Sequence, residues 1–383
     1  MASSKPIRKV LISGAGDISV LSVIDATIDP PKAGEVQVRP LYSGFSGADI
    51  NMREGVYPMQ KKAPLTPGYS LVGTVVALGL GTSNSSATGG RPLQPGQLVA
   101  SLTVYDAQAQ LVNLPEKYLI PVPDAVDPQS ATAVMLDWTT ALGLVEHAKV
   151  RAGQRVFVHG MSGAVGWALL TLCRLRGAAV YGTASASKHD LIRKEGGTSF
   201  VYTDKRWMQA MRELGGAHVV FDALGFESWG ESYDILKRKT SPAAPVKGGD
   251  SSPSAGLESG GLLVGYGGNL HNLTKPTPTP QEDGKSKGSA AAATPAQSQV
   301  SGIVKLLALN AKLWDSRSTS FWYISRDDKS FRPNVEKLFA MLAAGELKIP
   351  IKQVWDMEDI RQAHTSWGKG DGVGSILIKV NDE

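Results

Sequence analysis

Three glycines at the junction of a strand and a helix constrain the fold of this chain more than any other feature. Residues 155–158 (RVFV) are strand-like, glycines follow at positions 160, 163 and 166, and the apolar run 167–175 continues as a helix. The first glycine allows a tight reversal, the second a close approach to a pyrophosphate, and the third close packing of helix on strand. The helix N-terminus adds free N–H groups and a partial positive charge. A glycine-rich turn that binds nothing is the alternative, but the order strand, turn, helix favours a dinucleotide site on the backbone of Gly160, Ser162, Gly163, Ala164, Val165 and Gly166.

The tip of the next predicted strand, residues 178–183, indicates which dinucleotide is bound. An acidic residue at such a tip usually receives the ribose 2′-hydroxyl of NAD. Here residues 184–188 read ASASK, with no carboxylate to repel a 2′-phosphate. Ser185 and Lys188 supply a hydroxyl and an ammonium to receive one, so the sequence favours NADPH. Alternatively, Ser185 only caps the next helix and Lys188 is a solvated lysine of its first turn; both readings can hold together.

Length and composition limit the remaining possibilities. A chain of 383 residues suits two domains. The formal charge of +5 is small and its basic residues are scattered, which argues against nucleic acid and allows at most weak attraction to an acidic membrane surface. The single cysteine, Cys173, falls in the helix after the glycine turn, where we expect it in the core. With no apolar signal at residues 1–10 and no run of 18 uncharged apolar residues, we expect a cytoplasmic protein.

The pattern of predicted secondary structure changes near residue 127. Residues 1–126 are short strands and turns, and a helical segment, 129–148, then leads into the glycine turn. From there to residue 326 strands alternate with helices, which predicts a doubly wound parallel α/β sheet. Its six expected strands are 155–158, 178–183, 198–202, 217–224, 261–266 and 320–324. We assign the tail, 327–383, back to the first domain.

Two stretches interrupt the second domain. Residues 239–259 and 273–299 are rich in Pro, Ser, Gly, Ala and Thr and have few large apolar side chains. We expect them to be surface insertions, since long loops cost little additional closure entropy.

Five motifs resemble one protein family. They are residues 49–57 (DINMREGVY), 67–73 (PGYSLVG), 181–189 (YGTASASKH), 221–225 (FDALG) and the tail 353–374. Together with the glycine turn they resemble the quinone oxidoreductase branch of the medium-chain dehydrogenase/reductase superfamily, with the closest local similarity to the vesicle amine transport protein group. The resemblance implies a six-stranded Rossmann sheet that binds NADPH and a discontinuous, strand-rich GroES-like catalytic domain.

The chain departs from the zinc-containing alcohol dehydrogenases of that superfamily. Those relatives have a cysteine where this chain has Ser46, and a His-Glu pair where it has Tyr69 and Ser70. One cysteine cannot form their structural zinc lobe, and hydroxyl groups are poor zinc ligands. We therefore expect no metal.

Without a Lewis acid, polarisation of a carbonyl falls to protein donors. The resemblance to mitochondrial enoyl thioester reductases makes Tyr57 a candidate acid, which could act through water. Alternatively, Tyr57 packs a loop and its hydroxyl faces solvent. Quinone reductases usually have asparagine in place of Ser46, so Ser46 or Asn51 would supply a weaker donor. The apolar candidates for the substrate cleft are Phe45, Met52, Trp138 and Trp314.

The resemblance also implies positions around the cofactor. Tyr202 matches a tyrosine near the ribose phosphate, and Thr140 matches a threonine near the nicotinamide. Further matches flank the nicotinamide ring at Gly265, Tyr266, Gly267, Phe321 and Trp322. For the aromatic residues the alternative is sheet-edge packing and, for Trp322, a contact between subunits. Asp222 is expected to orient the turn after its strand.

These features predict an NADPH-dependent reductase that acts on a conjugated carbonyl, namely a quinone, an enone or an enoyl thioester. One alternative is a non-catalytic NADPH-binding adaptor or membrane-surface protein, and another is a simple ketone or aldehyde reductase. The apolar strand 320–324 is expected at the sheet edge, where it would pair with a second copy in a homodimer. The insertion 273–299 could cover this edge instead.

Overall fold

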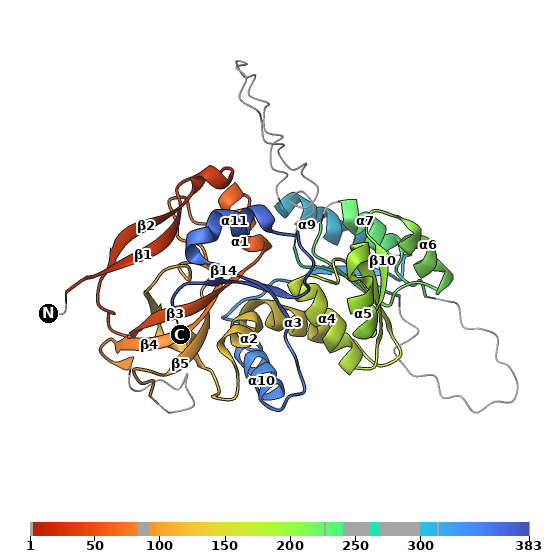
Figure 1. The fold of residues 1–383 in the computed structure, drawn as a ribbon. Coiled ribbons are helices and arrows are strands. Elements are labelled where there is room, and N and C mark those ends of the chain that lie inside the picture. The colour runs from red at the N-terminus through yellow and green to blue at the C-terminus, as the bar shows by residue number, and fades with distance from the viewer. Residues whose placement is uncertain are drawn as a thin grey trace, which may run out of the picture.

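The computed structural model describes residues 3–82, 92–225, 227–239, 260–267, 299–311 and 314–382. The predicted insertions at 239–259 and 273–299 lie almost entirely outside these ranges. Two units stand beside one another, one mostly of strands and one of helices around a parallel sheet (Figure 1). In the part of the chain that the structure describes, no helix is long and apolar enough to cross a membrane.

The parallel sheet confirms the predicted fold class. Its six strands run in the order β10-β9-β8-β11-β12-β13, and every neighbouring pair is parallel. Because β8 lies between β9 and β11, the chain winds outward from β8 in both directions, and the crevice at its carboxyl end is the expected ligand position. The bounds are β8 (Arg155–Val158), β9 (Ala179–Ala184), β10 (Thr198–Val201), β11 (Val219–Asp222), β12 (Leu262–Gly265) and β13 (Ser318–Phe321).

Helices cover both faces of this sheet. Alternate residues of β8 show the two faces, since Val156 and Val158 belong to one buried cluster and Phe157 to another with Trp207. Such two-sided burial explains why the strands are continuous apolar runs. The helices of this unit are α4 (Ala164–Leu175), α5 (His189–Lys194), α6 (Arg206–Glu213), α7 (Glu227–Asp234) and α9 (Gln299–Ala308), and a 3₁₀ turn (Leu309–Ala311) follows the last.

Five of the six predicted strands have different bounds in the structure, and two of them differ by more than one residue at each end. The strand expected at 320–324 is β13, which ends at Phe321 because its partner β12 ends at Gly265. The strand expected at 217–224 ends at Asp222. Its carboxylate accepts hydrogen bonds from Leu224 N (2.7 Å) and Gly225 N (3.4 Å), which turns the backbone out of the sheet and gives Asp222 the orienting role expected of it.

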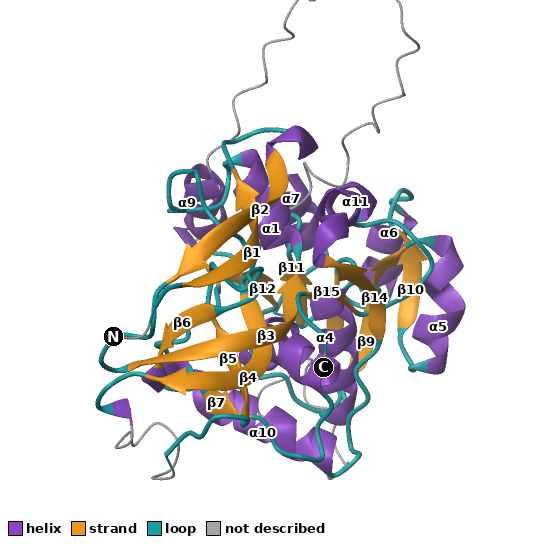
Figure 2. Cartoon of the chain, turned by 60° about the vertical axis from the view of Figure 1, so that its left-hand side comes forward, coloured by secondary structure: helices purple, strands orange, loops and turns teal. Residues whose placement is uncertain are grey.

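The strand-rich unit includes the end of the chain. Its seven-stranded sheet has the order β14-β15-β3-β4-β5-β7, with β6 also paired to β3. The tail strand β15 pairs antiparallel with β3, so residues more than 300 positions apart lie side by side (Figure 2). The bounds are β3 (Glu35–Phe45), β4 (Ser70–Leu78), β5 (Leu98–Leu102), β6 (Val112–Pro115), β7 (Ile120–Pro121), β14 (Ile351–Asp356) and β15 (Ser375–Lys379). A separate hairpin holds β1 (Lys5–Ile12) and β2 (Leu21–Ile28), and the helices are α1 (Gly47–Glu54), α10 (Phe331–Ala343) and α11 (Ile360–Ser366).

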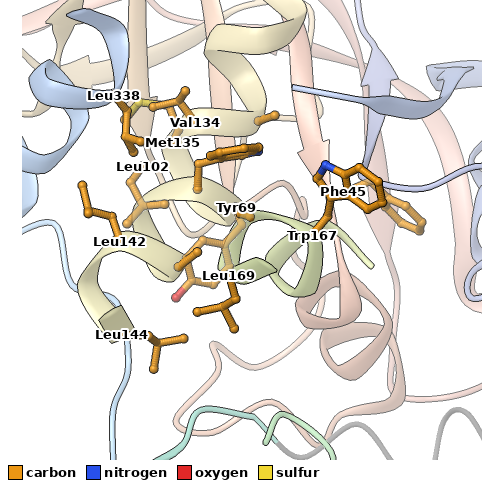
Figure 3. Close-up of a cluster of buried hydrophobic side chains, with 14 of the residues drawn as sticks. Phe45, Tyr69, Leu102, Val134, Met135, Leu142, Leu144, Trp167, Leu169 and Leu338 are labelled. Carbon is orange, nitrogen blue, oxygen red and sulfur yellow. The ribbon is translucent and has the colours of Figure 1, made fainter. Parts of the chain in front are cut away.

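One core joins the two units. The helical lead-in predicted at 129–148 is α2 (Pro128–Ala133), a π-helical turn (Val134–Trp138) and α3 (Thr139–His147). Its apolar side chains pack with α4 on one side and with the strand-rich unit on the other (Figure 3). Figure 3 shows Val134 and Met135 of the lead-in in the same cluster as Trp167 and Tyr69. This shared core fixes the glycine turn relative to the strand-rich unit.

Candidate active site

The glycine turn has the backbone geometry that a phosphate site needs. Gly160 has a φ of 67°, a left-handed conformation that favours glycine. A Cβ at Gly166 would lie 2.2 Å from the Gly160 carbonyl oxygen, so α4 packs as closely as only glycine allows. Gly163 begins α4 without a side-chain cap, and no acidic residue lies in the first turn. The first N–H groups, including those of Ala164 and Val165, therefore present a positive end to an anion.

Thr183, at the end of β9, holds this turn. Its hydroxyl accepts a hydrogen bond from Gly160 N (3.2 Å) and its carbonyl from Met161 N (2.9 Å). The same hydroxyl lies 3.3 Å from His159 Nδ1, and His159 Nε2 lies 3.0 Å from the Ser232 hydroxyl. Ser232 donates in turn to Asp222 (2.7 Å). Burial lowers the pKa of His159, so this network rests on a neutral imidazole. The sequence analysis missed it because its members lie at the ends of three strands, β8, β9 and β11, and on helix α7.

Lys188 does not face solvent. Its side chain is 5% exposed, and its Nζ donates to the Gly370 carbonyl (2.8 Å) and to an Asp371 carboxylate oxygen (3.3 Å). Ser185 is exposed and makes no capping hydrogen bond, although it stands at the N-cap position. The two alternatives to a binding role, a solvated lysine and a capping serine, are therefore wrong. Tyr202, 60% exposed, follows β10, and its N–H donates to Ala184 O at the neighbouring strand tip.

A groove of about 280 Å³ lies beside Lys188 in the tail of the chain. Its lining includes Lys352, Trp355, Lys369 and Asp371, and Lys352 Nζ donates to the Lys369 carbonyl. Burial, and then the charge of Lys188, lower the pKa of Lys352, while Asp371 raises it. The sequence analysis missed Lys352 and Lys369 of this groove. Lys352 precedes the tail motif 353–374 and Lys369 lies within it, but the local sequence does not indicate what the motif contacts.

The residues predicted near the nicotinamide gather at the ends of β12 and β13. Trp322 N donates to Gly265 O (2.9 Å), and the Trp322 indole packs so closely on α3 that a Cβ at Gly143 would lie 2.4 Å from it. Thr140 lies one helical turn before Gly143, on the same face. Tyr266 N donates to Asp222 O (3.1 Å), and burial raises the pKa of its phenol. Phe321 and Gly267 continue these strand ends, Phe321 with its ring 6.2 Å from that of Trp229.

Ser46 is occupied as a helix cap. Its hydroxyl accepts from Ala48 N (3.2 Å) and lies 3.4 Å from Asp49, while Asp49 accepts from Ser46 N (2.9 Å). The Ser46 hydroxyl, which was expected to polarise substrate, is thus used in the capping box. Polarisation of substrate would therefore need a different hydrogen-bond donor. Asn51 is buried within the same helix α1. Burial raises the pKa of Asp49 to about 7.

Tyr57 has a partner rather than a solvated hydroxyl. Its hydroxyl donates to the hydroxyl of Tyr69 over 2.7 Å, and the two rings meet edge to face at 5.9 Å. Burial raises the pKa of both phenols. Both are thus held as neutral hydroxyls that can donate a proton. Tyr69 was noted from the sequence only as a departure from zinc-binding relatives.

The expected apolar cleft residues lie elsewhere. Phe45, Met52 and Trp138 belong to the shared core and are at most 3% exposed, whereas Trp314 is 86% exposed. Within the described ranges, no three His, Cys, Asp or Glu side chains are grouped as a metal site would require. Cys173 is buried and free, as expected of a core cysteine.

Known proteins show similarity over nearly the full chain. Residues 32–124 match the alcohol dehydrogenase GroES-like domain. The synaptic vesicle membrane protein VAT-1 homolog of Mus musculus is 26% identical over 381 residues, which cover 97% of this chain and 84% of that protein. A probable quinone oxidoreductase of Schizosaccharomyces pombe is 24% identical over 98% of this chain and 97% of its own. The Rattus norvegicus VAT-1 homolog is 30% identical, but that match spans only 57% of its length.

A solved structure shares the fold. The Escherichia coli quinone oxidoreductase complexed with NADPH has a TM-score of 0.72 at 19% identity, over 97% of this chain and 99% of that one. The matched domain, the relatives and the parallel sheet confirm the resemblance drawn from the motifs. The chain is therefore similar to the VAT-1 homologues and to a probable quinone oxidoreductase, and it shares the fold of the solved quinone oxidoreductase.

Proposed function

We propose that this chain is an NADPH-dependent reductase that acts on a conjugated carbonyl, without zinc. The observation that carries the proposal is a phosphate-binding glycine turn with a buried lysine, Lys188, at the tip of the next strand. The oxidoreductase class and the cofactor are supported by relatives that include a probable quinone oxidoreductase and, among solved structures, one complexed with NADPH. The choice of a quinone, an enone or an enoyl thioester is our proposal.

The residues present fit the cofactor. The N–H groups at the start of α4 would hold the pyrophosphate, and Ser185, Lys188 and Tyr202 surround the strand tips where the adenosine ribose is expected. The ends of β12 and β13, with Thr140 beside them, would flank the nicotinamide. When bound, NADPH supplies a hydride, that is one hydrogen and two electrons.

Tyr57 is the proposed acid. Hydride addition to the double bond leaves negative charge on the carbonyl oxygen and the carbon next to it, and one proton must follow. Tyr57 can supply this proton directly or through water, since its phenol is protonated. Burial raises the pKa of this phenol, so the phenolate that forms needs a hydrogen-bond donor beside it. The resulting phenolate regains a proton from solvent, so the net change is a two-electron, two-proton reduction. Tyr69, 2.7 Å away, can rotate its hydroxyl to donate to that phenolate.

The donor set supports the proposed zinc independence. Where zinc-containing relatives place thiolate and imidazole ligands, this chain has the capping hydroxyl of Ser46 and the phenol of Tyr69. Neither is a good ligand for zinc. Retention of full activity after treatment with a chelator, with metal content measured in the same sample, is the expected result; loss that zinc alone restores would contradict it.

Substrate class is tested with matched compounds. Purified protein with NADPH is assayed against a quinone, an enone, an enoyl thioester and the corresponding saturated ketones, and the loss of NADPH absorbance is followed. Turnover should be confined to the conjugated compounds. Turnover confined to saturated ketones would contradict the proposal and favour a simple carbonyl reductase.

A non-catalytic adaptor is the second candidate, since several relatives are named synaptic vesicle membrane proteins. That reading requires that NADPH binds without oxidation by any compound of the panel and that anionic liposomes retain the protein at physiological salt. The homodimer also stays a proposal. It is motivated by β13, which forms one edge of the parallel sheet, and light scattering at micromolar concentration tests it, with a monomer as the contrary result.

A further inference from the structure

Asp371 makes an unusual contact for so exposed a residue. Its side chain is 97% exposed, yet one of its carboxylate oxygens lies 3.3 Å from the Nζ of Lys188, which is buried. The two residues come from different units and stand 183 positions apart. An exposed carboxylate has no need of this partner, whereas a buried ammonium needs an acceptor or an anion. We therefore interpret the contact as one that supplies the buried ammonium of Lys188 with an anion.

The segment that carries Asp371 runs from Lys188 toward the glycine turn. Gly370 O accepts from Lys188 Nζ (2.8 Å), and four residues later Gly374 N donates to the Ser162 carbonyl (3.2 Å). A dinucleotide with its pyrophosphate on α4 and its adenosine ribose beyond β9 spans the same two points. The 2′-phosphate of NADPH would thus arrive beside Lys188, where the carboxylate of Asp371 now lies.

A second ammonium makes this position favourable for a phosphate. Lys352 lines the same groove as Asp371 and lies close enough to Lys188 for their charges to interact. The charges of Lys188, Lys352 and Asp371 interact with one another, and two ammonium groups with one carboxylate leave an excess positive charge. A phosphate monoester carries a charge of about −1.5 to −2 at neutral pH, so it balances the two lysines better than a carboxylate does.

We propose that Asp371 is a specificity-determining residue that occupies Lys188 when the cofactor is absent and is displaced by the 2′-phosphate of NADPH. The Asp371 carboxylate keeps the buried ammonium of Lys188 paired. It competes with any other anion for this ammonium, and a more strongly charged anion is needed to displace it. NADH, which has a hydroxyl at this position, cannot displace it. The inference rests on the proposed use of NADPH.

The test compares Asp371→Asn with wild type by titration of NADPH and NADH, followed by quenching of tryptophan fluorescence. An ion pair whose carboxylate is exposed contributes about 0.2 to 1 kcal/mol, so removal of the competing charge should tighten NADPH binding by about 1.4-fold to fivefold. NADH binding should be unchanged. Asp25→Asn is the matched control, because Asp25 is also an exposed carboxylate, 94% exposed and 3.7 Å from Arg8 in the N-terminal hairpin. It changes the net charge equally, and Asp25 is not among the residues that line the groove.

Adenosine 2′,5′-bisphosphate and adenosine 5′-monophosphate isolate the 2′-phosphate from the rest of the cofactor. Only the first should bind more tightly to Asp371→Asn. If NADPH and NADH tighten equally, or if NADPH binding weakens or stays the same, the inference is overturned. Lys188→Ala separates this failure from failure of the proposed function. A wild type that prefers NADPH, and loses the preference in Lys188→Ala, supports the function even when Asp371→Asn refutes the inference.

Discussion

Substitution of Tyr69 by phenylalanine tests the proposed proton donor without touching it. The change removes one hydroxyl, 2.7 Å from that of Tyr57, and keeps the ring that packs edge to face on Tyr57. In the resting protein Tyr57 donates this hydrogen bond. After Tyr57 has given its proton to substrate, the Tyr69 hydroxyl is placed to donate to the phenolate. The substitution should therefore raise the energy of the state that follows proton transfer.

The magnitude follows from the charge on Tyr57. A hydrogen bond to a charged group contributes about 1.5 to 3 kcal/mol, compared with about 1 kcal/mol between neutral groups. The substitution also removes the neutral hydrogen bond of the resting state, so the net loss is about 0.5 to 2 kcal/mol, and kcat of Tyr69→Phe should fall by about twofold to thirtyfold. Tyr57→Phe removes the acid itself, so we expect a larger loss, about 10² to 10⁴. The double variant should lose little more than Tyr57→Phe alone, because Tyr69 acts only through Tyr57.

The assay is steady-state oxidation of NADPH with the best conjugated substrate, in water and in deuterium oxide. A defect in proton transfer should increase the solvent isotope effect in Tyr69→Phe and leave the NADPH dissociation constant unchanged. A kcat equal to that of wild type would refute the role of Tyr69. Additive losses in the double variant would show that the two phenols act separately, and a change confined to NADPH affinity would show a structural effect.

Three further predictions concern the turn, the strand tip and the buried acid. Gly166→Ala places a Cβ 2.2 Å from the Gly160 carbonyl and should abolish most NADPH binding in a titration, whereas Gly230→Ala, where no atom lies within 4 Å, should bind normally. Lys188→Ala should weaken NADPH binding by about tenfold to a hundredfold, with NADH little affected; an unchanged preference would contradict this. Burial raises the pKa of Asp49 from 3.8 to about 7, so the folded state keeps a proton that the unfolded state releases. The free energy of unfolding should thus fall as pH rises from about 4 to about 7, and Asp49→Asn should flatten this part of the profile in urea titrations; equal slopes in both proteins would refute the assignment.

The parallel sheet could be predicted because each of its parts has a local signature. Strand β8, the glycine turn and α4 follow one another within about twenty residues, and each requires a particular residue type at a particular place. The buried strands are short apolar runs that periodicity detects. The end of β13 could not be predicted in this way, since Phe321, Trp322 and Ile324 are all suited to a strand. Its last ladder position depends on where β12 ends, and that is a property of another segment.

Ser46 shows a different limit. A serine hydroxyl serves equally well as a helix cap and as a donor to substrate, and the comparison with relatives favoured the second role. The capping box was nevertheless visible in the sequence, because Ser46 is followed three residues later by Asp49, and α1 begins between them. A local rule that accounts for a polar residue should therefore be applied before a role is transferred to it from a relative.

The contacts that decide function in this chain are the ones that local rules do not reach. Tyr57 and Tyr69 are 12 positions apart in the sequence, at the two ends of a loop. Lys188 donates to acceptors that are 182 and 183 positions away. Hydrophobic periodicity predicts that a side chain is buried, but it does not predict which residues that side chain contacts. A lysine with a buried ammonium must have an acceptor or an anion, and the fold supplies both from the tail of the strand-rich unit. In the proposed site, residues of both units complete the cofactor crevice, so we expect the choice between NADPH and NADH to depend on how the units meet as well as on the strand tip itself.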